Sequence, residues 1–257
     1  MIDRHPRRAL LCGTALAFAL FPTVHGTEQN AAAKPAEKTY TLTVTKETTT
    51  MVALTAADAK VSEIAADLAK RVGAQVILGP SVKDEKITTQ FAGSPLELAM
   101  VSIAPHVIID YEVRRDAEPR ALGIYLLGNV DPEPSRSEVV RGTSQGMIVS
   151  GNTEDTGAPP PADAPLRVTY DKSRLTVFAK RQPLMVVLLT IADMLDVPAE
   201  IKRETTELVD VNIKNTSQIE ETIAGLSPGV RVYVRADVTR FYRTLLRVVL
   251  DSPPAKQ

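Results

Sequence analysis

The stretch VSEIAADLAKRVGAQVILGP, residues 61–80, sets a pattern that returns as LMVVLLTIADMLDVPAEIKR, residues 184–203. Both stretches place apolar residues at helical spacing and continue into a short apolar strand. Each then runs through a second strand, a second helix and a third strand, so residues 61–113 and 184–234 have the same order of predicted elements. The main prediction from the sequence is therefore one small α/β unit that occurs twice.

The start of the second helix gives the register of the repeat. Ser94-Pro95-Leu96-Glu97 corresponds to Ser217-Gln218-Ile219-Glu220, and the two glutamates lie 220 − 97 = 123 residues apart. Each tetrapeptide has the S-x-x-E pattern of a capping box, which predicts that a helix begins there. The same offset aligns five further pairs of similar residues: Val61 with Leu184, Ile64 with Val187, Leu68 with Ile191, Val72 with Leu195 and Pro105 with Pro228.

The residues before residue 61 predict two more strands for the first unit. Tyr40-Thr41-Leu42-Thr43-Val44-Thr45 alternates with the two-residue period of a strand, and residues 52–57 predict another. Asp58 is expected to cap the next helix, and Gly73 to end it in the left-handed conformation. The first strand has two interpretations: an edge strand of the same unit, or an arm that pairs with a partner's sheet.

The helix predicted to begin at Leu184 has more apolar residues than one core face requires. Five residues at helical spacing form its expected core face: Leu184, Val187, Leu188, Ile191 and Leu195. Met185, Val186 and Leu189 extend the apolar surface beyond that stripe, so a second side of the helix is expected to be covered. The cover is either the extra strand of its own unit or a contact with the first unit, a sister chain or another protein.

Arginines are concentrated in the last two predicted strands. Arg231, Tyr233 and Arg235 alternate with valines in the first of these strands. In the returning strand the apolar residues are expected to face inward. Arg243 and Arg247 are then expected to face outward, on the same side as Arg231 and Arg235. All five side chains are thus predicted to share one sheet face. That face is either solvated or a surface for an anionic or peptide partner.

Proline and glycine mark the segment between the two units. Residues 129–165 contain six prolines and four glycines, a composition that predicts a flexible linker. Met147-Ile148-Val149 is a short candidate for a strand fragment inside it. The expected boundaries are a signal peptide at 1–26, a tether and possible edge strand at 27–50, the first unit at 51–128, the linker at 129–165, the second unit at 166–251 and a tail at 252–257.

The first 26 residues have the features of an export signal. Arg4, Arg7 and Arg8 precede an apolar run too short to span a bilayer, and Gly26 supplies a small residue before a cleavage point. Cleavage there predicts a periplasmic mature chain without a transmembrane segment. The mature chain keeps no cysteine and one histidine, which excludes zinc sites built from Cys and His within one chain. We expect no metal and no cofactor.

Composition and charge exclude or weaken two further classes of function. The formal net charge is −1 and the chain has no tryptophan, so neither a basic surface nor a stacking platform for nucleic acid is expected. His106, between a predicted helix and strand, is interpreted as a turn residue. Asp110, Glu112 and Asp116 are the weak candidates for the acid pair of a hydrolase, because a solvated face is the ordinary role for carboxylates in a strand and turn.

A family resemblance is carried by two stretches. In the second unit it is Leu175-Thr176-Val177, which leads through Pro183-Leu184 into a helix, and in the first unit it is Gly93-Ser94-Pro95-Leu96-Glu97. They are similar to the secretin and TonB-dependent receptor N-terminal short domain (STN). The resemblance implies an α+β fold with two copies of a small two-helix, multi-stranded, sandwich-like module joined by the Pro/Gly-rich linker. It also implies a periplasmic interaction domain without enzymatic activity.

Two hypotheses of function arise from the sequence. The first is an adaptor or assembly factor that binds an envelope protein, such as a secretin-like or barrel component, through sheet edges and the apolar helix face. Self-association is an open alternative for the same surface. The second is a sensor that binds an envelope ligand or the cell wall through the face of Arg231, Arg235, Arg243 and Arg247.

Overall fold

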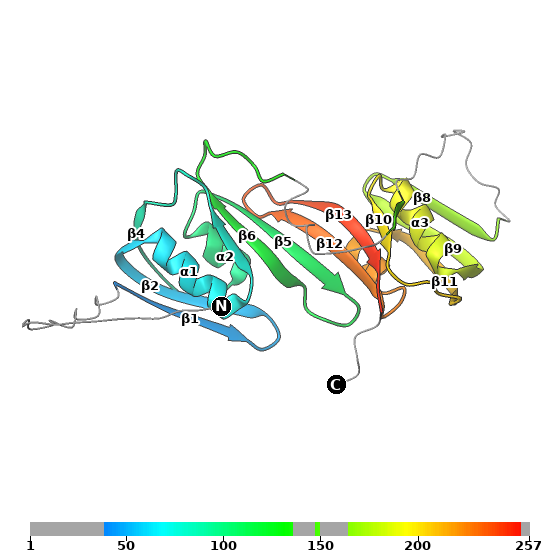
Figure 1. Cartoon of the computed structure of the whole chain (residues 1–257), viewed down its shortest axis with the longest axis horizontal. Helices are drawn as coiled ribbons and strands as arrows, with labels where there is room; N and C mark the ends of the chain where they lie inside the picture. The colour runs from blue at the N-terminus through cyan, green and yellow to red at the C-terminus, as the bar shows by residue number, and fades with distance from the viewer. Residues whose placement is uncertain (1–38, 136–146, 150–163, 253–257) are drawn as a thin grey trace, which may run out of the picture. The chain divides into compact units, whose positions relative to one another are not determined.

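A computed structural model describes residues 39–135, 147–149 and 164–252, and Figure 1 shows their arrangement. The predicted signal peptide and most of the predicted linker lie outside these residues. The described part is α+β and rich in strands. None of its helices has the length and apolar character needed to cross a membrane.

The N-terminal half, residues 40–127, contains six strands and two helices. In chain order they are β1 (Tyr40–Lys46), β2 (Thr50–Lys60), α1 (Val61–Val72), β3 (Gln75–Leu78), β4 (Lys86–Pro95), α2 (Leu96–Val101), β5 (His106–Arg114) and β6 (Arg120–Leu127). The alternating segment at residues 40–45 is therefore a strand, and it pairs with β2 of the same half.

The C-terminal half, residues 166–250, has the same order of elements. They are β8 (Leu166–Asp171), β9 (Arg174–Pro183), α3 (Leu184–Met194), β10 (Ala199–Ile201), β11 (Leu208–Thr216), α4 (Ile219–Ala224), β12 (Val230–Asp237) and β13 (Tyr242–Leu250). Between the halves, β7 (Met147–Val149) pairs with β10, so this fragment of the predicted linker is a strand.

Each half places its helices between two sheets (Figure 1). One outer sheet has the order β1-β2-β4, and the other has the order β11-β9-β8. The central sheet has seven strands in the order β3-β6-β5-β12-β13-β10-β7. One face of the central sheet packs on the helices of both halves. We call the opposite face, which carries Ile108, Asp110 and Tyr125, the second face.

Two aliphatic cores hold the layers together. In the N-terminal half, Leu54, Ile64 and Ile124 come from the outer sheet, a helix and the central sheet and belong to one buried cluster. In the C-terminal half, Val177 and Leu188 belong to the equivalent cluster. Apolar side chains at helical and strand spacing thus meet because each element buries one face against the next layer.

The two halves are joined by strand pairing as well as by the chain. β5 and β12 lie side by side and antiparallel, with Tyr111 opposite Val234 in their register (Figure 1). This pairing makes one continuous sheet from strands that the sequence assigns to separate units. We call the contact between β5 and β12 the seam. The sequence predicted a linker as the connection and did not predict the seam.

Several local predictions for helix ends were wrong. Neither α2 nor α4 has a side-chain capping hydrogen bond. The N-cap residue is Pro95 in α2 and Gln218 in α4, one residue after the serine that was predicted to cap each helix. Asp58 does not cap α1 either: it has a positive φ within β2, and its carboxylate lies 2.6 Å from Lys86 Nζ. Gly73 does end α1 in the left-handed conformation, as predicted.

The second face of β5 is buried, although the sequence predicted a solvated face there. Asp110 and Glu112 are each 1% exposed. Part of the cover comes from the beginning of the predicted linker, where the carbonyl oxygens of Pro134 and Ser135 accept hydrogen bonds from Arg235. Asp131 anchors the same segment by accepting hydrogen bonds from Ser81, and residues 129–135 therefore have a defined path.

Candidate functional site

The apolar residues that extend beyond the core face of α3 lie on its outer side. Val186 is 38% exposed, and Met185 and Leu189 are half-buried. The core face itself is as predicted, with Leu184 and Ile191 buried. The helix thus buries one apolar stripe and leaves a second one at the surface.

A groove runs beside this second stripe. Met185, Leu189 and Ile201 supply its apolar wall, and a polar rim is formed by Lys202, Glu204, Thr205 and Thr206. Its volume is about 750 Å³. An apolar floor with a few charged groups at the edge is the usual composition of a surface that receives a side chain or a short segment of another molecule.

The five residues predicted to share a sheet face divide between two faces. Arg231, Tyr233, Arg235 and Arg247 lie on the second face, and the guanidinium of Arg247 stacks 4.5 Å from the Tyr233 ring centroid. Arg243 lies on the helix side, where it binds Glu220 of α4 at 2.9 Å. The expectation of one shared face was therefore wrong for Arg243.

A β-bulge explains the position of Arg243. The register between β12 and β13 shifts between Tyr233 and Val234, so Tyr233 pairs with Arg247 while Val234 pairs with Leu245. One extra residue in β13 reverses the alternation of side chains beyond that point. A count of residues along the strand therefore assigns Arg243 to the wrong face.

The arginines of the second face are paired with carboxylates from other strands. Arg235 forms two hydrogen bonds with Asp110, at 2.7 and 2.8 Å. Arg247 binds the buried Glu200 at 2.8 Å. Each of these arginines therefore has a carboxylate partner within the chain, so the basic face on which the ligand-sensor hypothesis rests is occupied by ion pairs.

Glu112 is the most heavily paired of these carboxylates. Arg114 donates to both of its oxygens at 2.9 Å, and Arg120 lies 3.0 Å away. Arg231, from the other half, lies 3.6 Å from the same carboxylate. Glu112 and Asp110 thus hold cations on both sides of the seam, which is a structural role and differs from the exposed acid pair considered for a hydrolase.

A second hollow of about 540 Å³ opens on the helix side of the seam. Tyr111, Glu97 and Arg243 are among its lining residues. The Tyr111 hydroxyl donates a hydrogen bond of 2.6 Å to Glu97, and burial together with that carboxylate raises the pKa of Tyr111 above its ordinary value. Glu97 was predicted to be part of a capping box, and its observed partner is instead this tyrosine.

Sequence reasoning missed the carboxylates that organise the second face. Glu200 and Asp237 are buried there, and Glu133 approaches from the segment after β6. They are isolated in the sequence, with no spacing pattern that connects them to their partners. No protein-family model, curated protein or solved structure matches this chain, so its function has to be inferred from its own residues and their geometry.

Proposed function

We propose that the chain contains two diverged copies of one STN-like unit and acts as a non-enzymatic protein-interaction module of the periplasm. Support for the duplication comes first from the common order of elements. Both halves pair their strands alike: β1-β2-β4 corresponds to β8-β9-β11, and β3-β6-β5 to β10-β13-β12. A parallel pair ends each series, β3 with β6 and β10 with β13.

Backbone geometry gives independent support for the duplication. Asp58 and Arg181 both have positive φ, 53° and 48°, and lie 181 − 58 = 123 residues apart. Gly73 and Asp196 are separated by 196 − 73 = 123 residues and also have positive φ, 75° and 52°. Positive φ is uncommon for residues other than glycine, so its recurrence at the offset found in the sequence favours a common origin.

The seam has the symmetry that two copies would produce. Tyr111 pairs with Val234, and 111 + 123 = 234 makes these residues equivalent. Exchanging equivalent residues turns the pair Arg114–Arg231 into Asp237–Ile108, which is also a pair of the observed register. The two halves therefore meet as the two subunits of an isologous dimer do.

The observation that carries the proposed function is the apolar second stripe of α3 beside its groove. At the 123-residue offset, Met185, Val186 and Leu189 correspond to Ser62, Glu63 and Ala66 of α1. The copies share their core positions and differ on this outer surface, where the C-terminal copy is apolar. Such a local difference is typical of a binding surface, because the fold does not require it.

The partner that suits this surface is an envelope protein that presents an apolar segment. Its apolar side chains would contact Met185 and Leu189, and polar groups at its margin would meet Lys202 and Glu204. The distribution of an apolar centre and a charged rim is common to protein–protein interfaces. The periplasmic location and a secretin-like partner rest on the resemblance and on the N-terminal export pattern.

Affinity capture from envelope extract tests the proposal, followed by crosslinking and mass spectrometry to place the contact. The test variant combines Val186→Asp with Leu189→Asp, which adds two charges to the apolar stripe. We expect capture of the specific partner to fall at least about tenfold, since desolvating a charge opposes binding. Crosslinked peptides from the wild-type chain should come from α3 and residues 201–206.

The matched control is Ala66→Asp, an exposed position of α1 that corresponds to Leu189. It adds one such charge to the equivalent surface of the other half, which already carries Glu63, and should leave capture unchanged. Thermal unfolding of each variant establishes that it is folded. A folded double variant with an undiminished partner, or crosslinks that avoid α3, would show that this surface is not the binding site.

A further inference from the structure

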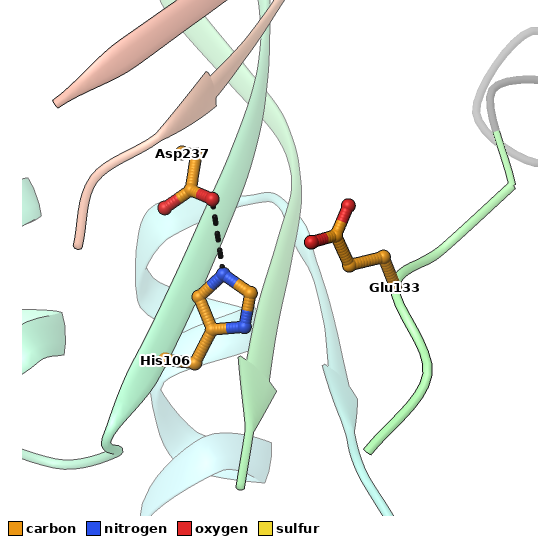
Figure 2. A group of neighbouring side chains, drawn as sticks. All are labelled: His106, Glu133 and Asp237. Carbon is orange, nitrogen blue, oxygen red and sulfur yellow. Dashed lines mark hydrogen bonds and ion pairs between the residues drawn. The ribbon is translucent and has the colours of Figure 1, made fainter. Parts of the chain in front are cut away.

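Three side chains that can ligate a metal ion converge at one end of the seam. His106 begins β5, Asp237 ends β12, and Glu133 lies on the segment after β6 (Figure 2). One ligand atom from each lies within 4.8 Å of the other two. The residues come from both halves and from their connection, so the cluster exists only in the folded chain.

The two buried members are already at the separation of metal ligands. His106 Nε2 and Asp237 Oδ2 are 3.1 Å apart, and their side chains are 10% and 9% exposed. Two ligands, each about 2.1 Å from one ion, are about 3.0 to 3.4 Å apart at the angles of octahedral or tetrahedral coordination. An ion can therefore replace the proton between these atoms with little movement of either strand.

Backbone contacts hold Asp237 in the required orientation. Its Oδ1 accepts a hydrogen bond of 2.9 Å from the Arg240 amide, which leaves Oδ2 directed at His106. The strand ends are also fixed, because the Val107 amide donates to Thr239 Oγ1 at 2.9 Å. Support of a ligating carboxylate by a second hydrogen bond is the usual arrangement around protein metal sites.

Glu133 offers a third, adjustable carboxylate. Its side chain is 55% exposed, and Figure 2 shows its carboxylate turned toward His106. An exposed side chain can change rotamer without a change in the backbone, so this carboxylate can adjust its distance to the two buried atoms. One imidazole and two carboxylates form a donor set suited to divalent first-row transition metals, with water at the remaining positions.

Arg240 is the competing cation of the cluster. Its guanidinium bonds to Glu133 and lies 3.5 Å from Asp237 Oδ2. The Arg240 side chain is 62% exposed, so it can turn into solvent when a divalent cation takes over its two carboxylates. The pair with Glu133 is exposed on both sides, and such pairs contribute little to stability, so its loss is a small cost against metal coordination.

We propose that His106, Asp237 and Glu133 bind one divalent transition-metal ion, for which Zn²⁺ serves as the experimental probe. His106 ligates as the neutral imidazole through Nε2, and its proton moves to Nδ1. The bound ion ties the start of β5, the end of β12 and the segment of Glu133 to one another. It thus fixes the seam independently of any partner bound to α3.

Calorimetric titration of the full chain with Zn²⁺ tests the site. Glu133→Gln removes an exposed ligand and should raise the dissociation constant at least about tenfold. Arg240→Gln removes the competing cation and should lower it several-fold. Glu47→Gln makes the same chemical change at an exposed glutamate away from the cluster and should match the wild type.

His106→Gln supplies the second variant. The glutamine amide can still donate to Asp237, yet it lacks a nitrogen lone pair for a metal. We expect Zn²⁺ to raise the melting temperature of the wild type, and we expect the His106→Gln variant to be folded without showing that rise. Equal Zn²⁺ affinity of the wild type, Glu133→Gln and His106→Gln would overturn the proposal and leave an adventitious ion only. Because none of these residues lies on α3, the outcome is separable from that of the capture experiment.

Discussion

The N-terminal and C-terminal halves have the same architecture but differ in what their first helices present to solvent. α1 carries Glu63 where α3 carries Val186, while Ile64 and Val187, the next residues, are fully buried in their cores. The two halves thus agree at buried core positions and differ at an outer position, where the packing of the fold does not restrict the side chain. For that reason the proposed binding surface lies on one half only.

The seam shows a second difference between the halves. At equivalent positions the N-terminal half has Asp110 and Glu112, and the C-terminal half has Tyr233 and Arg235. Asp110 pairs with Arg235 across the seam, and Glu112 pairs with Tyr233. Two identical N-terminal strands in this register would place Asp110 against Glu112. The charge difference therefore favours pairing between the halves over pairing of two N-terminal strands from two chains.

The largest effect is expected from breaking the seam at Asp110. Asp110→Ala leaves the Arg235 guanidinium, whose side chain is 11% exposed, without the carboxylate that it binds through two hydrogen bonds. Loss of one partner of such a pair costs about 3 to 5 kcal/mol. Urea unfolding should record this fall in the free energy of unfolding.

Asp84→Ala is the control for this measurement, because Asp84 is exposed and lies in a turn. Its effect should stay within about 0.5 kcal/mol. A cost of less than about 1 kcal/mol for Asp110→Ala would mean that the seam pair does not hold the halves together.

A smaller effect is expected at Tyr111, whose equivalent in the C-terminal half is Val234. Tyr111→Phe removes the hydroxyl that donates to Glu97 and should cost about 1.5 kcal/mol at neutral pH. Tyr242→Phe, at a residue that is 60% exposed, is the control and should be nearly neutral. An equal effect of the two variants would show that the buried hydrogen bond contributes nothing.

The pH dependence of unfolding tests the same hydrogen bond between Tyr111 and Glu97. Burial and Glu97 raise the pKa of Tyr111 in the folded chain, whereas the unfolded chain releases this proton near pH 10. Above that pH the unfolded state binds fewer protons than the folded state, so the free energy of unfolding falls as the pH rises. Unfolding of Tyr111→Phe should depend less steeply on pH there. An unchanged slope would contradict the assignment.

The smallest effects are expected at the ends of the first helices. Gly73 and Asp196 have left-handed backbones, which favour glycine. Gly73→Ala should lower the free energy of unfolding by about 1 kcal/mol. An added Cβ meets only Lys46 Nζ, at 3.9 Å, so backbone strain at positive φ accounts for most of this cost. Asp196→Gly should gain about 0.5 kcal/mol because the strain of a non-glycine residue is removed.

Chemical denaturation measures both changes, with Asp84→Gly as the control. Asp84 lacks a positive φ, and glycine there should destabilise the chain by increasing the entropy of the unfolded state. Opposite signs for Asp196→Gly and Asp84→Gly are the expected result. Destabilisation by Asp196→Gly would show that the strain at this turn is smaller than the entropy cost of glycine in the unfolded chain.

The candidate site on α3 was predictable in part. Helical spacing distinguished the core residue Leu188 from the outer residues Val186 and Leu189, because a helix turns about 100° per residue and reports its buried side directly. The groove beside them was not predictable, since Ile201 and Lys202 approach from β10 and the residue after it. Nothing in the spacing of α3 indicates which loop will lie against it.

The arginines show where local periodicity fails. Alternation placed Arg231 and Arg235 on one face correctly, because no bulge interrupts β12 between its partners on β5. The same rule failed for Arg243, where β13 has one extra residue opposite Tyr233. The cluster of His106, Glu133 and Asp237 could not be predicted by alternation, because a strand pattern carries no information on contacts between distant segments.

The order of elements and their apolar faces could be predicted from the sequence, because they depend on local spacing, and aligning the two patterns gave the 123-residue offset between the halves. The tertiary structure decided that β5 pairs with β12, that Asp110 and Glu112 are buried, and that Arg243 faces α4. The two kinds of information differ in the sequence separation over which they act. A periodic pattern reports whether a residue has a buried side, whereas the partner that buries it depends on strand edges meeting across more than a hundred residues.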